Sequence, residues 1–247
     1  MLSKRTFLAI GLALGLSGTA FADRSIRVVA DEWPPFSGDN LPNGGISLDV
    51  IATVLRRAGY EVETAILPWA RIMDGAPKGD YDVVGSLFYD PEIATYMTYG
   101  DPFFSTEVRF LQQAGAGLEV TGLDSLQGHS IAVGDGFLYE EKFDRATNLN
   151  KLVVTTALQG IQMVAHGRAD LTLDSVEVLN HSIRHGAPEI TDAVEFLPFV
   201  LATHDIHMAV FGGLENKDQV VADFNRVLAE MREDGSLSEL LQKHQVQ

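Results

Sequence analysis

Strand-like and helix-like hydrophobic patterns alternate along the first third of this 247-residue chain. Ile26-Arg27-Val28-Val29-Ala30 is a mostly apolar run that predicts a strand, and apolar residues then recur at helical spacing over 48–55. Two further strands are predicted at 62–66 and 81–85, with a helix opening at Pro68 between them. A β-α-β-α-β series of this kind predicts a mostly parallel sheet with helices on both faces.

The same rhythm restarts after a turn-rich segment at 124–128. Period-2 runs and short apolar runs predict strands, and i, i+3, i+4 stripes predict helices. The predicted strands are 130–133, 152–155, 170–173, 194–201 and 206–211, and the predicted helices are 158–165, 175–185, 220–231 and 236 onward. Ser47 is expected to cap the first helix of the chain, and Ser236 with Glu239 has the spacing of a capping box.

Two α/β series of similar size predict an α/β fold with two lobes. The joins fall near 112–117 and 202–205, so the second unit is inserted between the first unit and its own C-terminal helices. We therefore expect lobe one to comprise 23–113 plus 206–247, and lobe two to comprise 114–205. Because the chain crosses between the lobes twice, this layout is typical of a hinged clamp that closes on a ligand.

The N-terminus has the pattern of a secretory signal peptide over residues 1–22. Lys4 and Arg5 precede a short apolar run, and Ala20-Phe21-Ala22 fits the rule of small residues at the cleavage site. Cleavage would expose Asp23 and predicts a periplasmic protein. An uncleaved N-terminal anchor is the alternative, but the apolar run is short for a membrane span.

Composition narrows the class of partner. The net charge of −16 becomes −18 once Lys4 and Arg5 are removed, and a field of that sign repels nucleic acid and anionic lipid. The chain contains no cysteine, so packing alone must hold the fold even in an oxidising compartment. No later segment has the roughly 18 uninterrupted apolar residues of a transmembrane helix, and we expect the processed protein to be soluble.

Several short motifs occur in an order that is similar to the bacterial extracellular solute-binding proteins of family 3, the group typified by polar amino-acid binding proteins of ABC importers. They are Asp31-Glu32-Trp33-Pro34-Pro35-Phe36, Gly79-Asp80-Tyr81-Asp82-Val83-Val84, the stretch 90–104, Asp124 to Gly128, Gly167-Arg168-Ala169-Asp170 and Asp234-Gly235. The resemblance covers the processed chain. It implies a type II periplasmic-binding-protein fold, a small-molecule ligand, a membrane importer permease as partner, a monomer, and neither cofactor nor metal.

Two elements suggest a subgroup of that family. Pro68-Trp69-Ala70-Arg71 resembles the Pro-Trp-x-Arg element of members whose ligands are often unassigned, and Gly136-Phe137-Leu138-Tyr139 resembles their lobe-two loop.

The departures from the family pattern concern the ligand carboxylate. Ile93 stands where amino-acid binders have an arginine that pairs with that group in bidentate fashion. Phe88, Asp90 and Phe137 replace residues with small hydroxyl side chains, and the family's acid for the α-amino group aligns with Ser175, one residue after Asp174. A standard α-amino acid is therefore a doubtful ligand.

Candidate ligand-binding residues in lobe one each have a structural alternative. Trp33 and Phe36 could form an aromatic wall or pack their own loop. Trp69 and Arg71 are two residues apart and do not share a helix face, so one of them is expected to face the cleft. Arg71 could meet an anionic group or form a surface salt bridge.

Further candidates follow the carboxyl ends of strands, where open α/β sheets bind ligands. Because successive strand residues point opposite ways, we expect one of Phe88 and Tyr89 to face the cleft. Phe137 and Tyr139 could close from lobe two. Asp174 could receive a ligand amine or act in the first turn of the helix that follows.

Other functions remain as alternatives. His181 and His185 have a workable pair spacing for a metal, yet no third ligand follows at motif spacing, and a solvated helix face is favoured. We find no motif of a hydrolase, metalloprotease or phosphate-binding loop. A dehydratase similar to cyclohexadienyl dehydratases would need a carboxylate anchor, which Ile93 does not supply. A free-standing ligand sensor for a membrane receptor is the third reading.

Overall fold

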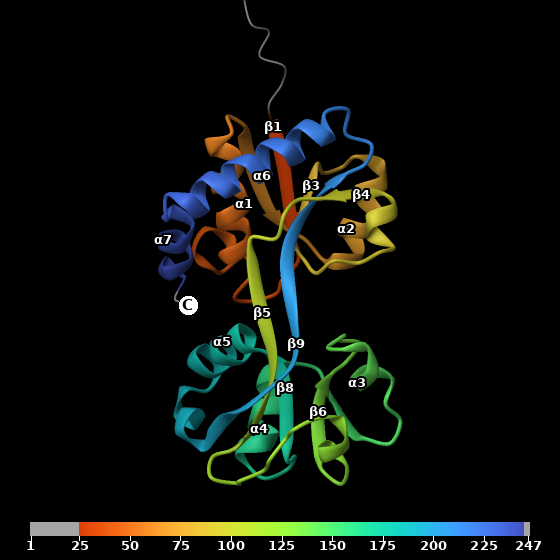
Figure 1. Ribbon diagram of the computed structural model, residues 1–247, viewed down its shortest axis with the longest axis vertical. Coiled ribbons are helices and arrows are strands. Elements are labelled where there is room, and N and C mark those ends of the chain that lie inside the picture. The colour runs from red at the N-terminus through yellow and green to blue at the C-terminus, as the bar shows by residue number, and fades with distance from the viewer. Residues whose placement is uncertain (1–24, 245–247) are drawn as a thin grey trace, which may run out of the picture.

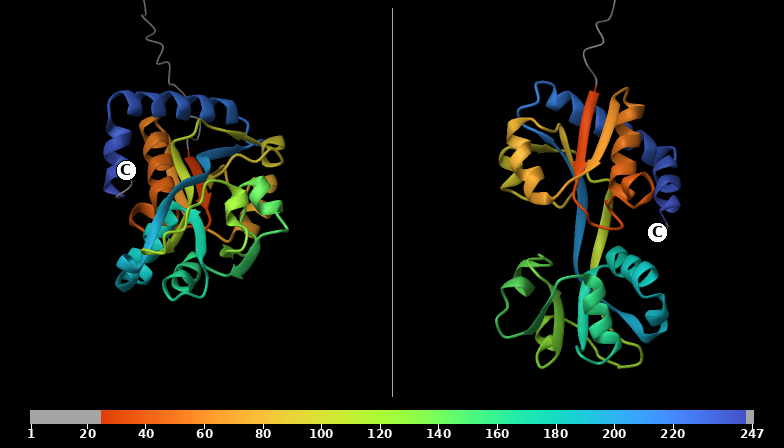
Figure 2. Two further views of the ribbon diagram at one scale, coloured as in Figure 1. Left: turned by 60° about the horizontal axis from the view of Figure 1, so that its bottom comes forward. Right: turned by 180° about the vertical axis from the view of Figure 1, so that it is seen from behind.

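A computed structural model describes residues 25–244, and the predicted signal peptide at residues 1–22 lies outside them. Two groups of strands and helices, lobe one and lobe two, are joined by the long strands β5 (Phe104–Gln113) and β9 (Val194–Phe211) (Figure 1). Seen from behind, the same two strands run between the lobes (Figure 2). The two-lobed α/β fold predicted from the hydrophobic pattern is confirmed.

Lobe one is a largely parallel sheet between two layers of helices. β1 pairs in parallel with both β2 and β3. The elements are β1 (Ser25–Ala30), α1 (Ile46–Arg57), β2 (Glu61–Ile66), α2 (Trp69–Gly75), β3 (Val83–Leu87), β4 (Met97–Tyr99), α6 (Lys217–Glu233) and α7 (Ser236–Lys243), with short 3-10 helices at Pro42–Gly44, Ala76–Lys78 and Ile93–Thr95.

Alternation along β1 explains why lobe one has helices on both faces. Val28 is fully buried in the cluster that contains residues of α1, α6 and α7, whereas its neighbour Val29 packs with Ile72 of α2 on the other face. Successive strand residues point to opposite faces, so the apolar run Val28-Val29-Ala30 must be covered on both sides.

Lobe two repeats this layering around β6, which pairs in parallel with β7 and β8. Ile131 packs with Phe143 of α3, and the next residue, Ala132, packs with Ile161 of α4. The elements are β6 (Ser130–Gly134), α3 (Glu141–Arg145), β7 (Asn150–Val154), α4 (Ala157–Ala165), β8 (Leu171–Ser175) and α5 (Val176–Gly186), with 3-10 helices at Leu123–Leu126 and Pro188–Ala193.

One sheet runs through both lobes in the strand order β2-β1-β3-β9-β5-β8-β6-β7, and β4 also pairs with β9. The two strands predicted at 194–201 and 206–211 are a single strand, β9. Its antiparallel pairing with β5 extends from Gln113↔Val194 to Phe104↔Ile206, with local register shifts, so the backbone stays extended between the lobes.

Both predicted serine caps are wrong. α1 begins at Ile46 after Gly45, and Ser47 is buried inside the helix. Ser236 is the first residue of α7, after a left-handed Gly235, and its amide is bonded by the Asp234 carboxylate. The Glu239 amide, which a capping Ser236 would have bonded, donates to the Gly235 carbonyl instead. Within residues 25–244, no helix combines the length and apolar character of a bilayer crossing.

Candidate functional site

A cavity of about 820 Å³ lies between the lobes and is lined by residues of both. Lobe one contributes the residues that follow the carboxyl ends of β1 and β3, including Asp31, Trp33 and Phe88. Lobe two contributes the loop after β6 and the end of β8, including Phe137 and Asp174. The parallel strands of both lobes therefore present their carboxyl ends to one space, and the carboxyl ends of strands are where open α/β sheets bind ligands.

Seven of the nine residues predicted from sequence line this cavity, and two do not. The seven are Trp33, Trp69, Phe88, Tyr89, Phe137, Tyr139 and Asp174. Phe36 has no exposed surface and lies in the core of lobe one, with its ring centroid 4.6 Å from that of Trp33. Arg71 is exposed on α2 but is not part of the lining. Phe36 therefore packs behind the cavity wall.

The aromatic wall of lobe one is a connected set of rings. The ring of Trp33 meets that of Phe88 edge to face at 5.1 Å, and Phe88 stacks on the imidazole of His204. Phe88 and Tyr89 both line the cavity, although strict alternation predicted only one of them. β3 ends at Leu87, so these two residues lie in a loop to which the alternation rule does not apply.

Two aromatic side chains of lobe two face the wall from the other side. Phe137 is 45% exposed and follows Gly136, whose φ of 72° suits the turn at this point. Tyr139 is buried, and its hydroxyl oxygen accepts a hydrogen bond of 2.8 Å from the Gly134 amide. Burial raises the pKa of Tyr139 well above its usual value, so this phenol stays neutral. Phe137 is the more available of the two for a ligand.

Asp174 is the most deeply buried carboxyl of the lining, with 6% of its surface exposed. One carboxyl oxygen accepts a 2.7 Å hydrogen bond from the Ser175 amide, and no ion pair reaches the group from residues 25–244. Burial raises the pKa of Asp174 to about 7, and the hydrogen bond from the Ser175 amide lowers the pKa by a smaller amount. Ser175 is the N-cap of α5, and its side chain makes no capping bond.

The arginine that lies opposite Asp174 in the strand register, Arg109, is paired with another carboxylate. Arg109 of β5 lies opposite Asp174 of β8. Its side chain bonds Glu107 instead, through Nε at 2.8 Å and through the terminal nitrogen at 2.7 Å. Asp174 therefore keeps a free carboxyl oxygen at the cavity.

The lining also contains residues that were not predicted from sequence as ligand contacts, among them Asp31, Ser86 and His204. Burial raises the pKa of Asp31, and the neighbouring carboxylate of Glu32 raises it further. Ser86 is buried with φ 59°, and its hydroxyl has no hydrogen-bond partner within the described part of the chain. The rule that selected Phe88 and Tyr89 applies equally to Asp31, which directly follows β1. Ser86 and His204 gave no such signal.

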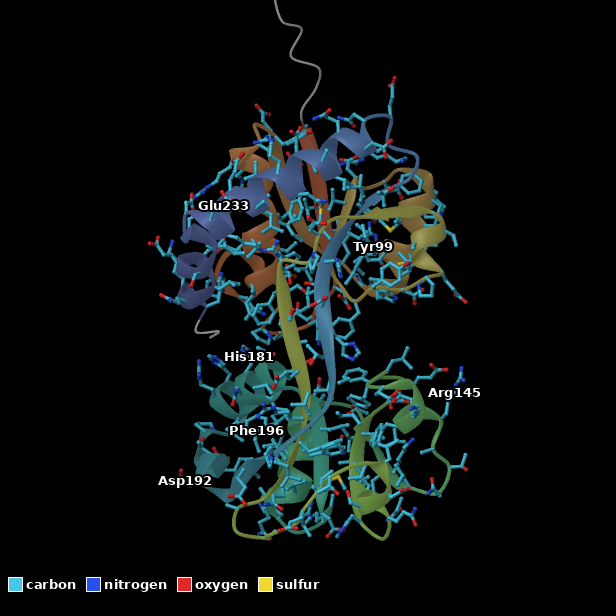
Figure 3. The ribbon with its side chains drawn as sticks, viewed as in Figure 1. Tyr99, Arg145, His181, Asp192, Phe196 and Glu233 are labelled. Atoms are coloured by element: carbon cyan, nitrogen blue, oxygen red, sulfur yellow. The ribbon has the colours of Figure 1, made fainter. Side chains whose placement is uncertain are left out.

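Ile93 occupies the position where the family pattern has arginine, and it lines the cavity from the 3-10 helix Ile93–Thr95. The one arginine of the lining, Arg145, bonds Glu141 at 2.7 Å and has a side chain that is 80% exposed. Figure 3 shows Arg145 at the outer edge of lobe two. Within residues 25–244 no group of three or more possible ligand side chains is arranged to hold a metal ion.

The family model for bacterial extracellular solute-binding proteins, family 3, matches residues 26–247. The chain belongs to this family. Its role is therefore the binding of a solute. Members of the family are extracellular or periplasmic binding proteins.

Known relatives of this family 3 protein bind amino acids. It is 24% identical to the L-cystine-binding protein TcyA of Bacillus subtilis, with 81% of this chain and 71% of that protein covered. It is 22% identical to the lysine/arginine/ornithine-binding periplasmic protein of Escherichia coli, with 98% and 96% covered.

Solved structures agree on the fold. An ancestral cationic amino-acid solute-binding protein superposes with a TM-score of 0.69 at 20% identity, covering 89% of this chain and 95% of that one. A histidine kinase sensor domain similar to periplasmic binding proteins gives 0.71 at 19% identity, with the same shares covered. This family 3 protein thus has the type II periplasmic-binding-protein fold.

Proposed function

We propose that this protein captures a small polar or aromatic-bearing solute, an amino acid or a related compound, between its two lobes in the periplasm and delivers it to an ABC-type membrane importer. The observation that carries the proposal is the cavity of about 820 Å³ lined from both lobes. A ligand that contacts both walls stabilises the closed form over the open one, and the closed form is what an importer can recognise. The leader at residues 1–22 would direct export and would be cleaved from the exported protein.

Closure is proposed to occur about the short interlobe part of β5 and β9. Ser105 pairs with Asp205 and Glu107 pairs with Thr203 in this stretch, and from Val108 onward β5 also pairs with β8 of lobe two. We therefore put the hinge at 105–107 and 203–205, inside the strands. The first crossing lies before the boundary at 113/114 expected from sequence, and the second lies at the boundary at 205/206.

The ligand contacts are proposed to come from the seven predicted lining residues, Trp33, Trp69, Phe88, Tyr89, Phe137, Tyr139 and Asp174. Phe36 would support Trp33 from behind. Arg71 would take no part in ligand contact, because it lies outside the cavity lining. Aromatic rings that face each other from two lobes offer a large apolar contact area that closure can bury.

A dehydratase on this fold is the second candidate, and Asp174 is the observation that favours it. A buried carboxyl with a pKa of about 7 can donate a proton near neutral pH. Prephenate and arogenate, however, are carboxylates, and the lining is rich in acids. We therefore propose binding without turnover. Conversion of either compound by the purified protein would reverse that conclusion.

The proposed function is tested by native mass spectrometry of the protein as purified, followed by calorimetry with whatever solute is released. Small-angle scattering with and without that solute should show a smaller radius of gyration for the complex. A panel of amino acids and related amines that neither binds nor compacts the protein, together with the absence of any co-purified solute, would contradict the proposal. If crosslinking recovers a membrane receptor instead of a permease, the function would be ligand sensing rather than import.

A further inference from the structure

The charge of the cavity lining is one-sided. Seven carboxylates line it, against a single arginine. Most of the seven already have partners within the protein. Glu140 accepts a hydrogen bond from the Phe143 amide, and Asp144 accepts from the amides of Tyr139 and Glu140. Asp90 accepts from the Glu92 amide, and Glu141 forms an ion pair with Arg145. Glu32 accepts from the amide of Asp39.

Asp31 and Asp174 come from opposite lobes. Asp31 accepts no hydrogen bond from another residue among 25–244, and Asp174 accepts a single one, from the Ser175 amide, on one of its two oxygens. Neither side chain has an ion-pair partner among the same residues. Both are shielded from water by the walls of the cavity, so each would gain from a positive charge placed between them. A cation that meets both carboxylates would hold the two lobes together.

The groups around these two acids suit an organic cation. Ser86 adds a buried hydroxyl with no partner of its own. Trp33, Phe88 and Phe137 add ring faces and edges to the same cavity. A cation is attracted to aromatic faces, most strongly to tryptophan, and an apolar body is stabilised by the same rings.

Among the described residues that line the cavity, no side chain offers a ligand carboxylate a comparable partner. Ile93 contributes only hydrocarbon, and Arg145 lies at the exposed edge in its pair with Glu141. An anion placed between Asp31 and Asp174 would be repelled by both carboxylates. It would also be desolvated, and no cationic side chain among the described residues is placed to compensate for the lost hydration.

We propose that the cleft selects a protonated organic amine that carries an apolar or aromatic body and no carboxylate. The inference rests on the proposed solute-binding function and narrows its ligand to amines rather than amino acids. The ammonium group lies between Asp31 and Asp174, and the body lies among Trp33, Phe88 and Phe137.

Matched pairs test the inference, because each amine differs from its parent amino acid only by the carboxylate. We would titrate the full protein by calorimetry at pH 8 with tyramine and tyrosine, phenethylamine and phenylalanine, and agmatine and arginine. At least one amine is expected to bind about tenfold or more tightly than its parent. An amino acid that binds as tightly as its amine, or a co-purified solute with a free carboxylate, overturns the inference and leaves the solute-binding proposal standing.

Variants locate the charge contact. Asp31→Asn and Asp174→Asn should each weaken binding of the best amine by about tenfold or more. Asp192→Asn makes the same change of charge on the edge of lobe two opposite Arg145, and should leave binding unchanged (Figure 3). Equal affinity in the wild type and in both cleft variants, with unfolding transitions that confirm folded protein, would refute the contact. If no amine or amino acid binds, scattering detects no compaction and no solute co-purifies with the protein, both proposals fail.

A reverse variant gives an independent readout. Ile93→Arg places a guanidinium at a lining position and should move the preference from amine toward amino acid in each pair. An unchanged ratio of the two affinities in a folded Ile93→Arg protein would contradict the idea that the missing cation is what excludes carboxylates.

Discussion

The ring of Phe88 stacks on the imidazole of His204, with centroids 4.5 Å apart and planes inclined by 26°. Phe88 follows β3 of lobe one, whereas Nε2 of the same imidazole donates a 2.7 Å hydrogen bond to the Tyr139 carbonyl oxygen of lobe two. His204 belongs to β9, in the stretch that joins the lobes. One side chain therefore contacts both walls of the cavity at the proposed hinge.

Removing this contact should change the relative positions of the lobes. In His204→Ala we expect a loss of about 1–2 kcal/mol of stability, from one hydrogen bond and one ring contact. We also expect a broader distribution of radii of gyration for the unliganded protein in small-angle scattering. His207→Ala is the matched control, because His207 is on the same strand but bonds the Gly100 carbonyl within lobe one. A shape change of the same size in the control would contradict the bridging role.

Asp174 should make the unliganded protein more stable in acid. Its pKa of about 7 in the folded protein lies above the ordinary value of 3.8, so folding favours the protonated form. This contribution is complete below about pH 4 and is lost as the pH rises through 7. At pH 8 the free energy of unfolding of Asp174→Asn, measured by urea titration, should therefore exceed that of wild type by roughly 2–4 kcal/mol. At pH 4 the two proteins should differ little.

The comparison isolates Asp174, since wild type and variant share every other titrating group. Asp192→Asn, which removes a carboxylate at an exposed position, should follow the wild-type curve at both pH values. Equal stabilities of Asp174→Asn and wild type at pH 8 would mean that the carboxyl is already neutral or solvated there.

Phe36 and Tyr89 should separate packing from ligand contact. Phe36→Ala empties a fully buried position of lobe one and should cost about 3–5 kcal/mol in urea unfolding. Tyr89 is 62% exposed and lines the cavity. Tyr89→Ala should therefore change the free energy of unfolding by less than about 1 kcal/mol and should lower the affinity for the solute. If Phe36→Ala instead weakened solute binding with little change in stability, Phe36 would be a ligand contact.

The C-terminal helix is anchored to α1 by a partly buried pair. Nε2 of His244 lies 2.9 Å from a carboxylate oxygen of Asp49, and both side chains are about one-tenth exposed. His244→Ala should reduce the free energy of unfolding by about 1–3 kcal/mol, because Asp49 then keeps only its bond from Asn43. His166→Ala, at an exposed histidine in lobe two, should stay within about 0.5 kcal/mol of wild type.

Local pattern was enough for most of the elements, and the exceptions have definite causes. Ser47 and Ser236 were wrong as caps because Gly45 and Gly235 precede them at the helix starts. β9 was predicted as two strands because the residues at 202–205 break the apolar run, yet pairing with β5 keeps the backbone extended through that stretch. Backbone hydrogen bonds between distant segments leave no trace in hydrophobic periodicity.

The sequence by itself determined the alternation of strands and helices, the family, and the loss of the arginine at position 93. Periodicity is local, and motif order along a chain is readable without coordinates. Only the tertiary structure decided that Phe36 packs behind Trp33, that Arg71 lies outside the cavity, and that Asp31 and Asp174 line it from opposite lobes without ion-pair partners among the described residues. Burial and pairing depend on what distant segments bring next to a side chain, and those neighbours exist only once the chain has folded.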